Sequence, residues 1–266
     1  MASSLRAHCG TCSKGFSLPG LPVHIVEKIK ECFFEGMDRQ TSVYLFGSAA
    51  TCNWVAGRSD VDLVVVAPKV KIDEIANQVR LWNQAPSHPK LDGYALSCVG
   101  RSCEAIHLER FEYVNFPLGM SIESGIELID QWNIKYRSKL LFGEASIAVF
   151  FPNNITHEEL NIWALGRLKQ ISFSNESVTK EFHWIVSWFA RMLMLYKEGV
   201  CGSKQEALQW LGSRYSEVRD LVDFLLENYP KPGWSDALIT IEQVKEWRGF
   251  CQKVLLEINE IDVCQG

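Results

Sequence analysis

Apolar residues in the first half of the chain form short enclosed runs separated by stretches of helical periodicity. Strand-like runs cover 42–46 and 63–66, and a further apolar run opens at Asp92. Helical spacing of apolar residues covers 22–37, 73–82 and most of 121–141. Short buried strands that alternate with amphipathic helices predict an α/β domain, with a mixed sheet flanked by helices.

The second half of the chain carries helical signals only. Two capping boxes, Thr156 to Glu159 and Ser203 to Glu206, place a hydroxyl and a carboxylate where they satisfy first-turn N–H groups. Helical segments are expected at 156–168, 179–197, 203–211, 218–226 and 241–258. We therefore expect a flexible N-terminal arm at 1–20, an α/β domain at 21–150 and an α-helical bundle domain at 151–266.

The composition is that of an ordinary globular protein. The chain has 266 residues, of which 47% are hydrophobic and 22% charged, and a net charge of -5. Phosphate neutralisation dominates affinity for long nucleic acid, so an acidic chain argues against that partner. No apolar stretch has membrane-spanning length and the N-terminus shows no secretory pattern. We expect a cytoplasmic protein without a membrane partner, and favour a monomer.

The cysteines suit reduced thiols better than a disulfide framework. There are nine, an odd number, and Cys98, Cys201 and Cys251 fall in apparent core segments. Cys9 and Cys12 have the spacing of half a zinc site, but no second pair follows to complete four ligands. We therefore assign this pair no metal.

The candidate chemistry centres on a glycine turn and two nearby carboxylates. Gly47 and Ser48 follow the first apolar run, and a glycine with a neighbouring hydroxyl lets backbone N–H groups approach a phosphate. Asp60 and Asp62 are two residues apart at the next run, so on a strand they would share one face. Two facing carboxylates repel unless a divalent cation lies between them, and oxygen ligands suit Mg²⁺. The alternative is a plain turn followed by two solvated aspartates.

This constellation resembles the signature of the DNA polymerase beta-like nucleotidyltransferase superfamily, a Gly-Ser turn followed by an Asp-x-Asp strand. The resemblance implies a third carboxylate at the start of a neighbouring strand. Asp92 is the candidate, and Glu104 is the alternative. Gly93 directly follows Asp92, and a glycine inside a strand often marks a bulge or turn.

An α/β domain of this kind followed by a helical bundle resembles the aminoglycoside O-adenylyltransferases that modify streptomycin or spectinomycin. The matching positions of the bundle are Glu181, Arg191, Gly199, Ser203 and Lys204, and Ala207 with Trp210. The resemblance implies that Lys204 binds the nucleotide triphosphate and that Glu181 contacts a cationic acceptor. The alternatives are an exposed lysine and a first-turn acid stabilised by the helix dipole. The family's further aspartate before Glu181 and its substrate-stacking tryptophan have no clear match here.

The resemblance implies Mg²⁺-dependent transfer of AMP from ATP to a hydroxyl of a small molecule, in antibiotic inactivation. Two Mg²⁺ ions would be held by Asp60 and Asp62, with Asp92 joining the catalytic ion and accepting the hydroxyl proton. Gly47, Ser48 and Lys204 would bind the nucleotide. Two alternatives remain: a nucleotidyltransferase with a protein or RNA acceptor, and a non-catalytic nucleotide-binding regulatory module.

Overall fold

The chain divides between Asn154 and Ile155 into two compact units. The computed structural model describes residues 20–35, 41–57, 59–99, 102–117, 126–151, 154–173, 182–228 and 239–265. The predicted arm lies outside this set apart from Gly20, and so does the Cys9 and Cys12 pair.

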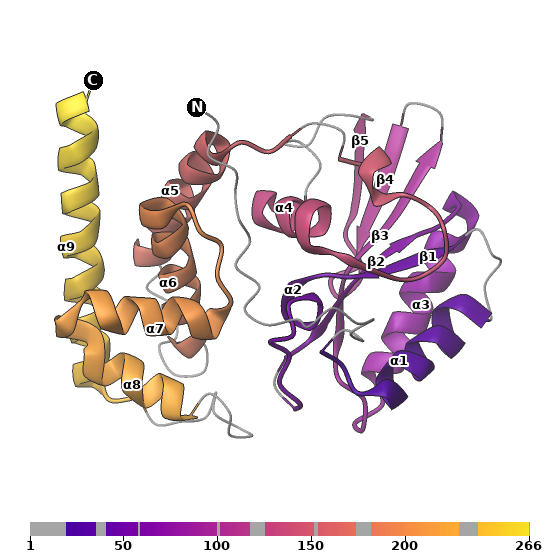
Figure 1. Ribbon diagram of the computed structural model, residues 1–266, viewed down its shortest axis with the longest axis horizontal. Helices are drawn as coiled ribbons and strands as arrows, with labels where there is room; N and C mark the ends of the chain where they lie inside the picture. Colours follow the sequence, from indigo (N-terminus) through magenta and orange to yellow (C-terminus); the bar gives the residue numbers. More distant parts are fainter. Residues whose placement is uncertain are drawn as a thin grey trace, which may run out of the picture. The chain divides into compact units, whose positions relative to one another are not determined.

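The first unit is built on one six-stranded mixed sheet with the order β5-β4-β3-β2-β1-β6 (Figure 1). The strands are β1 (Ser42–Leu45), β2 (Val61–Val66), β3 (Leu91–Val99), β4 (Ser102–His107), β5 (Tyr113–Pro117) and β6 (Lys139–Phe142). Only the central pair β2 and β3 runs parallel among the paired strands. Parallel neighbours need a crossover connection, and the helix between them supplies it.

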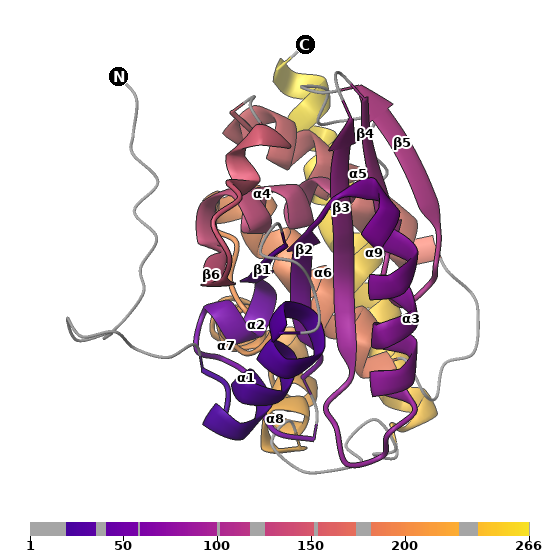
Figure 2. The ribbon, with the colours of Figure 1, turned by 90° about the vertical axis from the view of Figure 1, so that its right-hand side faces the viewer.

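Helices cover both faces of the sheet. They are α1 (Val23–Lys30) with a π-helical turn at Glu31–Glu35, α2 (Gly47–Ala50), α3 (Ile72–Asn83) after a 3₁₀ turn at Lys69–Lys71, α4 (Leu128–Arg137), and a 3₁₀ turn at Ile147–Val149. Apolar residues of α1 and α3 pack on one face of the sheet, whereas those of α4 and of 147–151 pack on the other. Figure 2 shows α3 alongside β3. The predicted α/β architecture is confirmed.

The strand β6 corrects the prediction of a helix through residue 141. The helix α4 ends at Arg137, and Lys139–Phe142 pairs with β1 at the sheet edge instead. Gly143 follows with φ +89, and a side chain there would meet the backbone of Thr41 and Ser42. The apolar run 140–142 therefore does not continue the helix α4 and forms the edge strand of the sheet instead.

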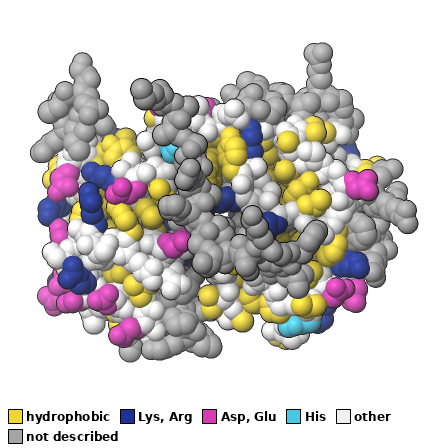
Figure 3. All heavy atoms as spheres, viewed as in Figure 1, with side chains coloured by type: hydrophobic (Ala, Val, Ile, Leu, Met, Phe, Trp, Pro, Cys, Tyr) yellow, Lys and Arg dark blue, Asp and Glu magenta, His cyan; other side chains and the backbone are white. Residues whose placement is uncertain are grey.

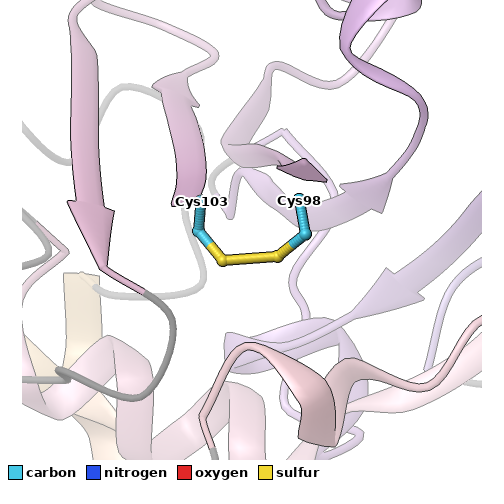
Figure 4. The surroundings of a disulfide bond; sticks show 2 residues. All are labelled: Cys98 and Cys103. Atoms are coloured by element: carbon cyan, nitrogen blue, oxygen red, sulfur yellow. A yellow bond between two sulfur atoms is a disulfide. The ribbon is translucent and has the colours of Figure 1, made fainter. Parts of the chain in front are cut away.

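The disulfide between Cys98 and Cys103 corrects the prediction that Cys98 is a reduced thiol (Figure 4). The two cysteines face each other in the antiparallel β3 and β4 pair, with Cα atoms 4.3 Å apart. That separation lies close to the range that a disulfide spans. Cys201 and Cys251 are buried thiols outside any disulfide, as expected of core cysteines.

The second unit is helical throughout its described residues. It consists of α5 (His157–Phe173), α6 (Phe182–Glu198), α7 (Lys204–Arg214), a 3₁₀ turn at Ser216–Val218, α8 (Arg219–Asn228) and α9 (Ile241–Gln265). Both predicted capping boxes form, at Thr156 with Glu159 and at Ser203 with Glu206. An edge-to-face cluster around Phe189 joins α6 to α9. The predicted helical bundle is confirmed.

Surface properties agree with the acidic composition. On the face shown in Figure 3, the described basic and acidic side chains are interspersed and form no broad basic patch. None of the described helices combines the length and apolar character that crossing a bilayer requires.

Candidate active site

The register of β2 and β3 brings two of the predicted carboxylates side by side. Asp62 and Asp92 are direct partners in this parallel pair, so both side chains leave the same face of adjacent strands. The next residues on that face, Val64 and Tyr94, belong to the core beneath α4. Neighbouring strands are about 4.8 Å apart, which leaves two carboxylates within reach of one cation.

The glycine turn after β1 lies directly against Asp62. The Phe46 N–H donates to the Asp62 carbonyl oxygen at 3.0 Å, which fixes the turn beside the start of β2. Gly47 has φ +61, and a Cβ built on it would lie 2.0 Å from Oδ2 of Asp62. Only glycine leaves that carboxylate its position, because any other residue would occupy it. Ser48 is half-buried, and its carbonyl oxygen accepts from the Asn53 N–H at 2.9 Å.

Asp92 is three-quarters buried, with 24% of its side chain exposed. Burial raises the pKa of Asp92, although the Gly93 N–H donates to Oδ1 at 2.6 Å and partly opposes that shift. Gly93 has φ +116, and a Cβ there would lie 2.0 Å from the Leu63 carbonyl oxygen. Instead of a bulge, Gly93 permits the close approach of β2 and β3 that aligns the two aspartates.

His107 lies beside Asp92 as a neutral ring. Its Nδ1 is 3.6 Å from Oδ1 of Asp92, too far for a hydrogen bond. The same Nδ1 accepts from the backbone N–H groups of Glu109 and Arg110 at 3.3 Å each, which places the ring proton on Nε2. Burial lowers the pKa of His107 and keeps the ring uncharged at neutral pH.

Tyr94 ties this region of the sheet to α4. Its hydroxyl donates to Oδ2 of Asp130 at 2.9 Å, and its ring stands edge-on to His107 at a centroid distance of 5.1 Å. Burial raises the pKa of Tyr94, so the hydroxyl keeps its proton and remains a donor. The Tyr94 side chain, which follows Asp92 on the same face of β3, is therefore held in place by contacts with α4 and β4.

The remaining predicted residues lie in different surroundings. Asp60 is exposed and directly precedes β2. Glu104 faces Ser97 at the far end of β3 and pairs with Lys69 at 2.5 Å, so it is Asp92 that lies beside Asp62. No three His, Cys, Asp or Glu side chains converge on one point within the described ranges. The pair Asp62 and Asp92 fits Mg²⁺, which takes one or two protein carboxylates and completes its shell with water and phosphate oxygens.

The predicted residues of the second unit are only partly described. Lys204 is the first residue of α7, directly after the cap Ser203, and it is exposed. Arg191 donates from Nε to the Gly202 carbonyl oxygen at 3.1 Å and lies over the Trp188 ring, which anchors the turn before α7. Glu181 lies outside the described residues, so its predicted contact with the acceptor stays a prediction.

Comparison with known proteins points to the same part of the chain as the candidate active site. A family model of the nucleotidyltransferase domain matches residues 26–94, a segment that contains Gly47, Asp60, Asp62 and Asp92. This part of the first unit is thus similar to a nucleotidyltransferase domain. The predicted enzyme class, a nucleotidyltransferase, is thereby confirmed. None of the curated proteins matches the sequence as a relative.

The fold of the chain is similar to that of a solved enzyme. This is the spectinomycin adenyltransferase AAD(9) from Enterococcus faecialis, determined with ATP and spectinomycin. The TM-score is 0.60 at 13% sequence identity, over 88% of this chain and 97% of that chain. At this low identity the match shows a shared fold and no more. That fold is the architecture that the sequence predicts.

Sequence reasoning did not identify Lys90, His107, Glu109, Tyr94 and Asp130 as neighbours of the carboxylates. One signal was present, because Lys90 and Tyr94 lie two residues either side of Asp92 and so share its face in an extended strand. The others come from β4, from the turn after it and from α4. Their approach depends on tertiary packing that no local pattern encodes.

Proposed function

We propose that the protein transfers AMP from ATP to a hydroxyl group of a cationic small molecule, an aminoglycoside such as spectinomycin or streptomycin. The observation that carries this proposal is the alignment of Asp62 with Asp92 on one sheet face, with Gly47 lying against the Asp62 carboxylate. A tight turn beside paired acids is the arrangement that metal-chelated polyphosphate requires. It favours a catalytic site over a regulatory nucleotide-binding module.

Asp62 and Asp92 would hold Mg²⁺, with Asp60 contributing to a second ion. Bound there, the metal would neutralise the triphosphate and stabilise the charge of an in-line displacement. Gly47 and Ser48, the first residues of α2, would present backbone N–H groups to the phosphates.

Asp92 accepts the proton of the acceptor hydroxyl in this proposal. The hydroxyl oxygen forms a bond to the α-phosphorus, the bond from that phosphorus to the bridging oxygen breaks, and pyrophosphate leaves with the bonding electrons. Burial raises the pKa of Asp92 in the metal-free protein. The products are pyrophosphate and an adenylylated acceptor.

Two considerations support a cationic acceptor. The similar solved enzyme was determined with ATP and spectinomycin. The chain is itself acidic, with net charge -5, and an acidic surface attracts cations. Within the proposal, Glu181 contacts the acceptor and Lys204 binds the triphosphate.

The proposal is tested by incubating the purified protein with ATP, Mg²⁺ and spectinomycin or streptomycin and analysing the products by mass spectrometry. We expect one acceptor to gain an adenylyl group, and we expect chelation of Mg²⁺ to prevent the gain. Labelled ATP with a cell lysate is the parallel arm. Label on protein or RNA with no modified antibiotic would contradict the small-molecule acceptor.

A further inference from the structure

A lysine lies among the carboxylates of the candidate site. The Val61 N–H donates to the Lys90 carbonyl oxygen at 2.8 Å, one step before the Asp62 and Asp92 pair, which places Asp60 beside Lys90. Residues two apart in an extended chain share a face. At the start of β2 and β3, Asp60 thus lies beside Lys90, and Asp62 lies beside Asp92. Three acidic side chains and one basic side chain share this face.

Lys90 is held by an acid from the turn that follows β4. Its Nζ forms a close ion pair with Oε1 of Glu109, in the turn that follows β4. Both side chains stay partly in solvent, with 44% and 40% exposed, so the pair adds little stability by itself. What the pair does supply is a fixed position for one positive charge next to Asp60 and Asp92.

The electrostatic environment of Lys90 agrees with this geometry. Partial burial alone would lower the pKa of Lys90, but the hydrogen bond to Glu109 and the charges of Asp60 and Asp92 raise it above its ordinary value. The hydrogen bond from Lys90 lowers the pKa of Glu109 in turn. The other nearby basic groups are engaged differently, since Arg110 pairs with Glu112 at 3.5 Å and the His107 ring is neutral.

We propose that Lys90 is a built-in countercation of the metal site and that Glu109 is the positioning residue that restrains it. In the metal-free protein the ammonium offsets repulsion among Asp60, Asp62 and Asp92. When Mg²⁺ binds, Glu109 keeps Lys90 at the edge of the site, so that the lysine does not occupy the ion's place. The pair therefore sets how much Mg²⁺ the enzyme needs, an inference that rests on the proposed nucleotidyl transfer.

The proposal predicts opposite effects for the two partners. Lys90→Gln removes a positive charge beside Asp60 and Asp92, so half-saturation should need severalfold less Mg²⁺. Glu109→Gln releases Lys90 to compete with the metal, so half-saturation should need severalfold more Mg²⁺. The double variant should return close to the wild type, because the two charges cancel.

The measurement is the midpoint of thermal unfolding during Mg²⁺ titration at constant ionic strength, with and without an ATP analogue that cannot be cleaved next to the α-phosphorus. A ligand that binds only the folded state raises the midpoint by mass action. Lys69→Gln and Glu104→Gln are matched controls, because they remove the same charges from an ion pair at the far end of the sheet. Lys90→Arg keeps the charge and should behave as the wild type.

Opposite shifts at Lys90 and Glu109, with no shift at the control pair, would support the proposal. Equal shifts at both pairs, shifts of the same sign, or the absence of any Mg²⁺ effect on the wild type would overturn it. Should Lys90→Gln not fold, Glu109→Gln and Lys90→Arg still decide the matter. Failure to modify any acceptor would contradict the proposed function alone, whereas unshifted titrations of an active enzyme would contradict this inference alone.

Discussion

Gly47 and Asp62 lie so close that a single methyl group on the glycine would stand 2.0 Å from Oδ2 of the aspartate. The two residues come from different elements, α2 and the start of β2, and the hydrogen bond from Phe46 to the Asp62 backbone holds them together. The turn and the carboxylate therefore form one unit, in which the missing side chain of one residue makes room for the side chain of the other.

Gly47→Ala should abolish transfer while leaving the protein folded. The methyl group meets the end of a flexible side chain, so Asp62 rotates away at little cost and its carboxylate leaves the site. A displacement of about 1 Å in a catalytic group can lower the rate about a hundredfold. We expect at least that loss in steady-state AMP transfer, with a destabilisation of about 1–2 kcal/mol from the left-handed backbone.

Gly57→Ala is the control for backbone strain. Gly57 has φ +75, but a Cβ there meets no atom within 4 Å. It should show a similar loss of unfolding free energy in urea and near-normal transfer. Equal transfer by the two alanine variants would contradict the role assigned to the contact between Gly47 and Asp62.

Asp92→Asn should stabilise the metal-free protein at neutral pH even though it removes transfer. Burial raises the pKa of Asp92 above its ordinary value of 3.8, so the ionised carboxylate costs the folded state free energy that the unfolded state does not lose. That cost is present in full above the raised pKa and disappears as pH falls below the unfolded value. The amide carries no such cost at any pH.

The check is urea unfolding of both proteins in EDTA across the acidic range. The variant should be the more stable at pH 7, and the difference should shrink as pH falls through the raised pKa of Asp92. Glu104→Gln supplies the comparison, because it removes a carboxylate of the same sheet that lies away from Asp92 at the far end of β3. A variant that is less stable at pH 7 would show that Asp92 holds the fold through its charge.

Gly93→Ala should damage the fold itself. A Cβ at this position would lie 2.0 Å from the Leu63 carbonyl oxygen, which is backbone in the neighbouring strand and cannot turn aside. With the left-handed φ of +116, we expect a loss of about 3 kcal/mol or more in unfolding free energy. Gly249→Ala, inside α9 with open space around it, should instead add about 0.5–1 kcal/mol.

Reduction of the Cys98 to Cys103 disulfide should cost about 2 kcal/mol, because the bond closes a short loop and loop closure sets most of the gain in the chain-entropy account. Unfolding in urea with and without reductant measures this loss. The double variant Cys98→Ala with Cys103→Ala should give one midpoint in both conditions. A wild type that is indifferent to reductant would argue against the bond.

The sequence contained enough to predict the central part of the site. Asp62 and Asp92 each open an apolar run, and the resemblance to the nucleotidyltransferase superfamily placed Asp92 on a strand that neighbours the strand of Asp62. From the sequence, Gly93 indicated a bulge or turn, because a glycine inside a strand often marks one. Its real effect is on the neighbouring strand, where it clears room for the Leu63 carbonyl oxygen, and only the pairing of β2 with β3 reveals that.

Other features depended on contacts that the local pattern does not encode. The run 140–142 is apolar in both a helix and an edge strand, and its pairing with β1 decides between them. Cys98 and Cys103 become neighbours through the hairpin of β3 and β4. Lys90 was visible two residues before Asp92, but its restraint by Glu109 needs the turn after β4 to fold back onto β3.

The most direct test of the central claim compares pyrophosphate release from ATP, in the presence of Mg²⁺ and the acceptor, for Asp62→Asn, Asp92→Asn and Glu104→Gln. The account predicts that both aspartate variants lose release by a factor of about a hundred or more, since each removes a group that stabilises the transition state. Glu104→Gln should retain the wild-type rate. Wild-type release by either aspartate variant would contradict the claim that the aligned pair performs the transfer.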